Sequence, residues 1–336
     1  MRLLPVAALT FCAIGPAWAQ DNALEPKEWT VPWEDTRPRD PIMDQSGRVW
    51  FVGQRGNYIA YLDPKSGQFK RYEIEAGTNP HNIVTDPTGG IWFTGNRNGR
   101  LVKLDPATGE LKNYMMPDST VRDPHTLLFG PDGIGWFSAQ QSQRIGRIDP
   151  KTGDIKLWRP PGEGRSNPYG VVIDKDGRPY INLWASNRIA TIDPKTLEYK
   201  EYVHPDARMR ARRIAITSDG QLWFADYRGF LNHLDPKTGK FEEFPMPSGA
   251  RAQPYAHTQD DKDRIWIVET GVQPNKMVAF DTKTKQWVAN FAIPSNGATR
   301  NTVRHMTFNR ATREIWFGTD AGTIGHVKVP QEINTV

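Results

Sequence analysis

The sequence has little that could cross-link the chain or hold it in a membrane. Its 336 residues include a single cysteine, Cys12, so no disulfide can form within the chain. Beyond the first nineteen residues there is no long apolar run, although a spanning helix needs about 20 such residues. Lysines and arginines are scattered among acids, and the formal net charge is only +5. These absences exclude a disulfide-stapled module and a multispanning membrane protein, and they give no nucleic-acid signature.

The first nineteen residues have the pattern of a secretory signal. Arg2 precedes an apolar run, and Ala17, Trp18 and Ala19 fit the small-x-small rule for cleavage. The pattern predicts a signal peptide over residues 1–19, which removes Cys12. Residues 20–336 are then expected to form a single periplasmic or secreted domain that must bury a real core.

An aromatic landmark recurs seven times along the chain. Its first members are Trp50, Trp92, Trp136, Tyr180, Trp223, Trp266 and Trp316, and the next residue is Phe or Ile. Their spacings are 42, 44, 44, 43, 43 and 50 residues, within the range of four-stranded propeller blades. Regular Gly and Pro residues favour many short strands, and no helical pattern is convincing. The sequence therefore predicts an all-β, seven-bladed β-propeller, with the landmark aromatics packed between blades.

The two ends of the chain are expected to complete the same blade. Asp-Pro turns such as Asp63-Pro64 separate the third and fourth strands of most repeats, but the seventh repeat stops after its third strand at residues 324–329. Residues 28–32 resemble the outer strands of other repeats, which begin near Lys200 and Glu243. The N-terminal strand should therefore close the ring and remove its exposed edges.

One repeat position always carries a large side chain with hydrogen-bonding groups. It lies eleven residues before each landmark, and we call its seven members the collar: Arg39, His81, His125, Tyr169, Arg212, Tyr255 and His305. Because the first strand of each propeller blade lines the central channel, the collar is expected at one channel mouth. The sequence places further polar groups at that mouth, including Arg213, Arg304, Asp226, Glu269 and Asp320.

The collar residues suggest a site for an anionic ligand. Guanidinium groups would bind a carboxylate and would keep nearby imidazoles neutral, so His305 could act as a base. Converging carboxylates could hold a divalent cation such as magnesium if arginines do not consume them. A purely structural explanation also exists, because propeller channels are often polar and filled with water. A zinc ion held by His81, His125 and His305 is a minor alternative.

The repeats resemble the streptogramin B lyases, also called virginiamycin B lyases. The resemblance lies in the Pro-His and Pro-Tyr pairs that open blades, the glycine before Trp-Phe, and the Arg-Ile-Gly-Arg-Ile-Asp-Pro segment at residues 144–150. It implies a seven-bladed propeller that linearises a cyclic depsipeptide by magnesium-assisted elimination. His305 matches the catalytic histidine of that family, and Tyr255 stands where the family has a substrate-contacting histidine. The family's two magnesium carboxylates correspond to Val303 and Thr319, neither of which can replace a carboxylate.

These observations predict an exported, lyase-like enzyme acting on an anionic or ester-containing small molecule, with His305 as catalytic base. The expected substrate-binding residues are Arg39, His81, His125, Tyr169, Arg212, Tyr255 and Arg304. Glu269 and Asp320 are the candidate ligands for magnesium, and no other cofactor is expected. A non-catalytic binding propeller and a metal-dependent lactonase remain alternatives. We expect a monomer with a small-molecule ligand and neither nucleic acid nor membrane as partner.

Overall fold

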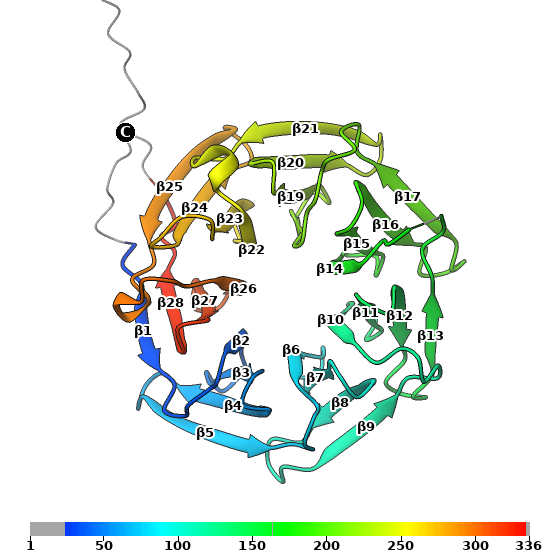
Figure 1. Cartoon of the computed structure of the whole chain (residues 1–336), viewed down its shortest axis with the longest axis vertical. Helices are drawn as coiled ribbons and strands as arrows, with labels where there is room; N and C mark the ends of the chain where they lie inside the picture. The colour runs from blue at the N-terminus through cyan, green and yellow to red at the C-terminus, as the bar shows by residue number, and fades with distance from the viewer. Residues whose placement is uncertain (1–23, 163, 334–336) are drawn as a thin grey trace, which may run out of the picture.

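The chain folds as a ring of seven four-stranded antiparallel sheets around a central axis (Figure 1). The computed structural model describes residues 24–162 and 164–333. The first three blades are β2 (Pro38–Met43), β3 (Val49–Gly53), β4 (Tyr58–Asp63) and β5 (Gln68–Glu73); β6 (Pro80–Thr85), β7 (Ile91–Gly95), β8 (Arg100–Leu104) and β9 (Leu111–Met115); and β10 (Pro124–Phe129), β11 (Gly135–Ala139), β12 (Arg144–Ile148) and β13 (Ile155–Trp158). The next three are β14 (Pro168–Ile173), β15 (Pro179–Leu183), β16 (Arg188–Ile192) and β17 (Tyr199–Val203); β18 (Ala215–Ile216), β19 (Leu222–Asp226), β20 (Phe230–Asp235) and β21 (Lys240–Pro245); and β22 (Pro254–Gln259), β23 (Arg264–Glu269), β24 (Lys276–Asp281) and β25 (Gln286–Ala292). The predicted propeller is confirmed.

The seventh blade joins the two ends of the chain. It consists of β26 (Val303–Asn309), β27 (Glu314–Thr319), β28 (Thr323–Lys328) and the N-terminal β1 (Lys27–Thr30). The side chain of Glu28 strengthens this closure, because it accepts hydrogen bonds from Thr323 Oγ1 at 2.6 Å and from the Ser295 backbone at 2.7 Å. Ring closure by the N-terminal strand is therefore confirmed, and β1 ends two residues earlier than the sequence suggested.

The landmark aromatics form the core between neighbouring blades, as predicted. Trp50, Trp92, Trp136, Trp266 and Trp316 are all at most 1% exposed. Three of the indoles are also anchored by an aspartate six residues earlier, in the turn between the first two strands. The indole Nε1 atoms of Trp50, Trp92 and Trp266 donate to Asp44, Asp86 and Asp260 at 2.7, 2.8 and 2.9 Å. Buried indoles require such acceptors, so the recurring aspartate is a structural element of the repeat.

A β-bulge accompanies the collar in most blades. The pairing between the first and second strands shifts register within the first five residues of β2, β6, β10, β14, β22 and β26. A bulge leaves one residue unpaired and redirects its side chain. In the fifth blade the first strand is reduced to Ala215–Ile216, with an isolated bridge between Ala211 and Asp226 beside Arg212. The backbone is thus irregular where the collar side chains enter the channel.

Helical structure in the described residues is limited to two short 3-10 turns, η1 (Gly249–Arg251) and η2 (Ser295–Gly297). No helix among the described residues is long and apolar enough to cross a membrane. The predicted signal peptide, residues 1–19, lies outside the described residues.

Candidate active site at the channel mouth

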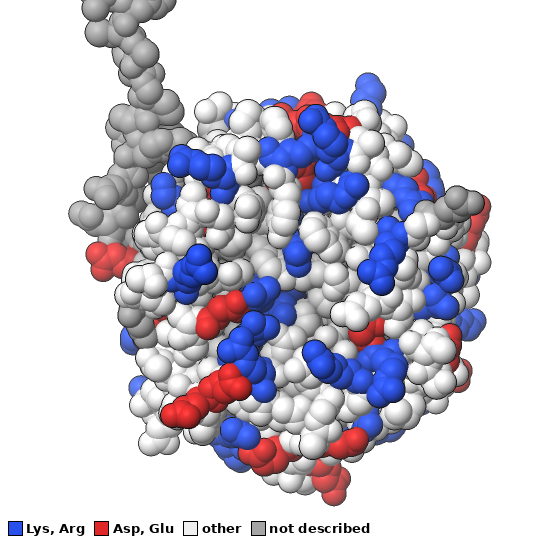
Figure 2. Space-filling view, in the orientation of Figure 1, with Lys and Arg blue, Asp and Glu red and all other residues white. Residues whose placement is uncertain are grey.

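The collar side chains meet at the mouth where first strands begin and second strands end, on the face seen in Figure 2. Arg39, His81, His125, Tyr169 and Tyr255 are at most 5% exposed. Arg212 and His305 are partly exposed. The structure therefore brings the predicted site residues together around one channel, and two of them remain open to solvent.

The two histidines of the second and third blades pack against each other with their ring planes tilted by 37°. The rings of His81 and His125 lie 3.6 Å apart between centroids, and the ring of Tyr169 lies 4.2 Å beyond His125. His81 Nδ1 approaches the His125 carbonyl oxygen at 3.1 Å, and His125 Nδ1 approaches Thr126 Oγ1 at 2.9 Å. Burial, with Arg39 and Arg213 nearby, holds the pKa of both imidazoles well below their usual range. Both rings are therefore neutral.

Two tyrosines form a hydrogen-bonded pair across the channel. The hydroxyls of Tyr169 and Tyr255 contact each other directly, and Arg212 lies 3.4 Å from each oxygen. Burial raises the pKa of Tyr169 to about 12. Burial also disfavours ionisation of Tyr255, but the surrounding guanidiniums outweigh it and lower the pKa of that phenol. Tyr255 is consequently the more acidic member of the pair.

Arg212 is held over the mouth by aromatic rings. Its guanidinium carbon lies 4.1 Å from the ring centroid of Trp184 and 5.6 Å from that of Tyr227. Tyr169 and Tyr255 contribute further faces at 5.3 and 4.9 Å. Such cation–π contacts fix the orientation of the guanidinium while leaving its N–H groups available for an anion.

The channel below the collar contains a buried ion cluster. Asp40 is fully buried, and its two carboxylate oxygens lie 3.6 Å from Arg39 Nε and 3.7 Å from Arg213 Nη2. Arg213 crosses the channel from the fifth blade and donates to Thr126 of the third blade at 3.1 Å. Asn82 donates to Asp40 at 2.9 Å. Although burial alone would raise it, the pKa of Asp40 is lowered by His305 and these arginines, so the carboxylate is ionised.

His305 lies beside this cluster in the form that a base requires. Burial lowers its pKa to about 4, against an opposing effect of Asp40, and Arg213 and Arg39 lower it further. Its Nδ1 atom is buried and has no hydrogen-bond partner among the described residues. The imidazole is therefore neutral near pH 7.

The carboxylates predicted at this mouth are engaged with other groups. Asp320 accepts hydrogen bonds from Arg304 Nε and Nη2 at 2.9 and 2.6 Å, and Arg37 Nε lies 3.8 Å away. Glu269 is fully buried and binds the backbone N–H and the hydroxyl of Ser248. Asp226, also fully buried, pairs with Arg228. Glu269 and Asp320 therefore bind different groups, Ser248 and Arg304.

This donor set does not fit a magnesium ion. The described residues contain no group of three or more His, Cys, Asp and Glu side chains that could hold a metal. The two positions at which the sequence resemblance implies carboxylates hold Val303 and Thr319, and Thr319 is hydrogen-bonded to Thr323 at 2.7 Å. The predicted magnesium and zinc sites therefore find no support in this geometry.

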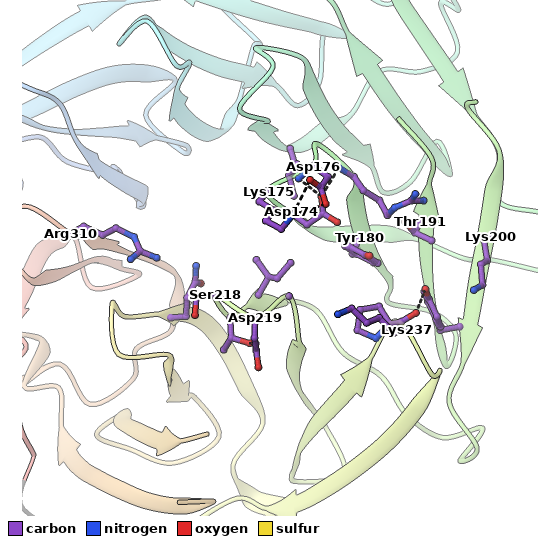
Figure 3. Close-up of a pocket in the computed structure, with 18 residues that line it drawn as sticks. Asp174, Lys175, Asp176, Tyr180, Thr191, Lys200, Ser218, Asp219, Lys237 and Arg310 are labelled. Atoms are coloured by element: carbon purple, nitrogen blue, oxygen red, sulfur yellow. Dashed lines mark hydrogen bonds and ion pairs between the residues drawn. The ribbon is translucent and has the colours of Figure 1, made fainter. Parts of the chain in front are cut away.

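A cavity lies on the face opposite the collar, between the fourth and fifth blades (Figure 3). It measures about 690 Å³ and includes Asp174, Asp176, Ser218 and Asp219. Asp174 accepts hydrogen bonds from the backbone N–H groups of Asp176 and Arg178, both at 2.9 Å. These acids stabilise turns between strands, so the channel mouth remains the stronger candidate site.

The fold and the collar together agree with one family of propellers. The sequence profile of the Virginiamycin B lyase family matches residues 24–327. The chain belongs to this family. The match covers nearly all the described residues, including every blade, and it confirms the resemblance found in the sequence. No curated protein matches the chain.

Solved structures support the same architecture. A streptogramin B lyase is 24% identical with a TM-score of 0.80, and the alignment covers 91% of this chain and 98% of that chain. Virginiamycin B lyase from Staphylococcus aureus is 23% identical with a TM-score of 0.81, covering 91% and 100%. The extracellular domain of a putative hybrid two component system from B. thetaiotaomicron is 16% identical with a TM-score of 0.71, covering 92% of this chain and 43% of that chain. At these identities the similarity establishes the fold.

Several contributors to the site were not assigned a role from the sequence. Asp40 directly follows a collar residue, yet only the fold shows that it lies between Arg39 and Arg213. Trp184 and Tyr227 follow their landmarks by four residues, and that spacing was the available signal for their place at the mouth.

Proposed function

We propose that this chain is an exported carbon–oxygen lyase that acts on an anionic small molecule at the collar mouth. The single observation that supports this most strongly is the position of neutral His305 beside a cluster of guanidinium groups. A base needs a neutral imidazole, and an anionic substrate needs cations that are already fixed in place. The membership of the chain in the Virginiamycin B lyase family supports the same class of reaction.

The proposed step is an elimination. His305 takes a proton from the carbon next to the substrate's carbonyl or carboxylate, and the released electron pair forms a carbon–carbon double bond. The bond between the neighbouring carbon and its oxygen breaks, and that oxygen leaves with the bonding pair. Arg212 and Arg304 would bind the anionic group and stabilise the negative charge that develops on it.

No metal is needed in this scheme. Because Val303 and Thr319 offer no carboxylate and Asp320 is paired with Arg304, the cationic role falls to the guanidiniums. Addition of a chelator should therefore leave turnover unchanged. Of the lyases similar to this chain, one was solved as a catalytically inactive histidine-to-alanine variant with quinupristin. Quinupristin is accordingly one probe among a panel of carboxylate-bearing esters and glycosides.

The test is turnover of that panel by the wild type and by His305→Ala, followed by mass spectrometry in heavy-oxygen water. Elimination should yield an unsaturated product without solvent oxygen, and the variant should be slower by about a hundredfold or more. His233→Gln is the matched control, since His233 lies outside the channel and contacts Gln221 at 2.7 Å. Unchanged turnover in His305→Ala, or incorporation of solvent oxygen, would refute the assignment.

A non-catalytic binding propeller is the second candidate, and the missing carboxylates at positions 303 and 319 favour it. In that case the wild type would bind members of the panel without forming any product. His305→Ala would then change affinity alone. Export is part of both proposals and is tested by sequencing the N-terminus of the protein recovered from the periplasm or medium.

A further inference from the structure

An arginine-rich groove occupies the same mouth over the first three blades, beside the collar. It measures about 900 Å³ and includes five arginines and one aspartate. Its lining residues are Arg37, Gln54, Arg55, Asn79, Asn96, Arg97, Thr120, Arg122, Asp123, Gln141, Ser142 and Arg165. Figure 2 shows the corresponding gathering of basic side chains around this part of the mouth. The groove is therefore strongly cationic.

Most of this positive charge is not neutralised by the protein. Among the described residues, no carboxylate lies within ion-pair distance of Arg97, Arg122 or Arg165, and all three side chains are exposed. The carboxylate of Asp123 is already occupied by the Gln141 backbone at 2.5 Å and by Ser142. An anion entering the groove would thus meet guanidiniums without displacing an internal partner.

The groove continues into the collar through Gln54. The side chain of Gln54 lines the groove and accepts a hydrogen bond from Arg39 at 3.2 Å. Asn79 in turn donates to the Gln54 backbone at 3.1 Å, and Asn96 donates to Pro124 at 3.1 Å. The side chains of Asn79 and Asn96 donate through nitrogen in these contacts, so their carbonyl oxygens can bind hydroxyl groups. A ligand in the groove could therefore reach the collar without leaving a polar surface.

The groove also repeats with the blades. Arg55 and Arg97 occupy equivalent positions, five residues after Trp50 and Trp92, and Gln141 is the third equivalent. Adjacent blades consequently present equivalent polar groups side by side. Such an array suits a ligand with repeated anionic units better than a single small anion.

We propose that this groove binds a linear acidic oligosaccharide, whose carboxylates pair with Arg97 and Arg122 and whose hydroxyls bind the neighbouring amides. Guanidinium–carboxylate pairs account for the charge, and the amides account for a polyhydroxylated chain. None of the described residues that line the groove is aromatic, so they offer no stacking surface for the bases of a nucleic acid. This proposal rests on the proposed function only where it places the end of the oligosaccharide at His305.

The test is calorimetric titration of the mature chain with trigalacturonate and trimannuronate at low ionic strength. We expect at least one of the two acidic trisaccharides to bind, with an affinity that falls as salt is added. The neutral maltotriose should not bind. The double variant R97Q/R122Q should raise Kd by about tenfold or more, because two charge-assisted contacts are lost. The control R310Q/K237Q removes two exposed charges from the opposite-face cavity and should bind like the wild type.

Three results would overturn the proposal: no binding of either acidic trisaccharide, unchanged Kd in R97Q/R122Q, or equally tight binding of oligothymidylate. The thermal midpoint of each variant shows whether it has kept its fold. The groove lining does not include His305, so binding at the groove is measured separately from turnover. Binding of a trisaccharide leaves the groove assignment standing even if the turnover test refutes the lyase, whereas turnover of the panel without binding of either trisaccharide would refute only the groove.

Discussion

Tyr255 offers the most direct test of the electrostatics at the collar. Burial disfavours a phenolate there, yet Arg39, Arg212, Arg213 and Arg304 together lower the pKa of Tyr255 from its ordinary value of 10.0 to about 7. That change corresponds to about 4 kcal/mol in favour of the phenolate. Tyr169, whose pKa is raised to about 12, keeps its proton and donates it to the ionised oxygen.

The perturbation is Tyr255→Phe, and the assay is the ultraviolet absorbance of phenolate as a function of pH. The wild type should gain one phenolate near pH 7, well before the bulk of its tyrosines, and the variant should lack this step. Tyr180→Phe is the control, because burial raises the pKa of Tyr180 and it lies outside the collar. A wild-type titration with no step below about pH 9 would refute the reasoning, as would a step that survives in Tyr255→Phe.

Protein stability gives a second measurement of the same shift. Because the folded pKa of Tyr255 lies below its unfolded value, its contribution is fully present above pH 10 and is lost as the pH falls through about 7. Between about pH 7 and pH 9 this group should add roughly 2 kcal/mol to the free energy of unfolding. Urea denaturation should show that increment in the wild type relative to Tyr255→Phe.

Three other variants test the packing and charge around the site, each by urea denaturation. His257 is buried, which lowers its pKa to about 4. Its contribution to the free energy of unfolding is therefore complete above pH 6.5 and is lost as the pH falls toward 4. His257→Gln should reduce the acid-induced loss of stability by roughly 3 kcal/mol, and an unchanged pH profile would contradict the assignment. Asp40→Asn leaves two buried guanidiniums without their carboxylate and should cost about 3 kcal/mol, whereas a cost near zero would show that the cluster is not needed. Gly170→Ala places a Cβ 2.5 Å from the Arg212 carbonyl oxygen and should destabilise the fold by about 2 kcal/mol, unless the neighbouring strand moves freely.

The fold was predictable because it repeats. Each blade needs the same aromatic pair between sheets, so the landmark spacing reports the number of blades directly, and Trp50 and Trp316 are buried as that argument requires. The closing strand was predictable for the same reason, since an unfinished seventh repeat leaves an edge that another segment must cover. The anchoring aspartates, such as Asp86 beneath Trp92, also repeat, and their pattern was available without being used.

The contacts within the site were not predictable to the same degree. A repeat indicates which residues reach the channel, but it does not indicate how far each side chain extends across it. Arg213 passes over the channel to Thr126, 87 residues away in sequence, and Tyr169 meets Tyr255, 86 residues away. Asp320 was expected at the mouth, but its pairing with Arg304 depends on side-chain packing. Pairings of this kind depend on competition among charged groups, which the spacing of residues does not determine.

Val303 and Thr319 stand where the family resemblance implies carboxylates, and arginines surround the same mouth. A divalent cation held by carboxylates attracts a neutral carbonyl oxygen as well as an anion, because a vacant coordination site accepts either. A guanidinium is a weaker electrophile, and it binds most strongly to a carboxylate or phosphate that matches its paired N–H groups. Arg212 is fixed for such a contact by Trp184, and the adjacent groove extends the same preference over three blades. Val303, Thr319 and the arginines around the mouth therefore support the proposal of a substrate that carries its own negative charge.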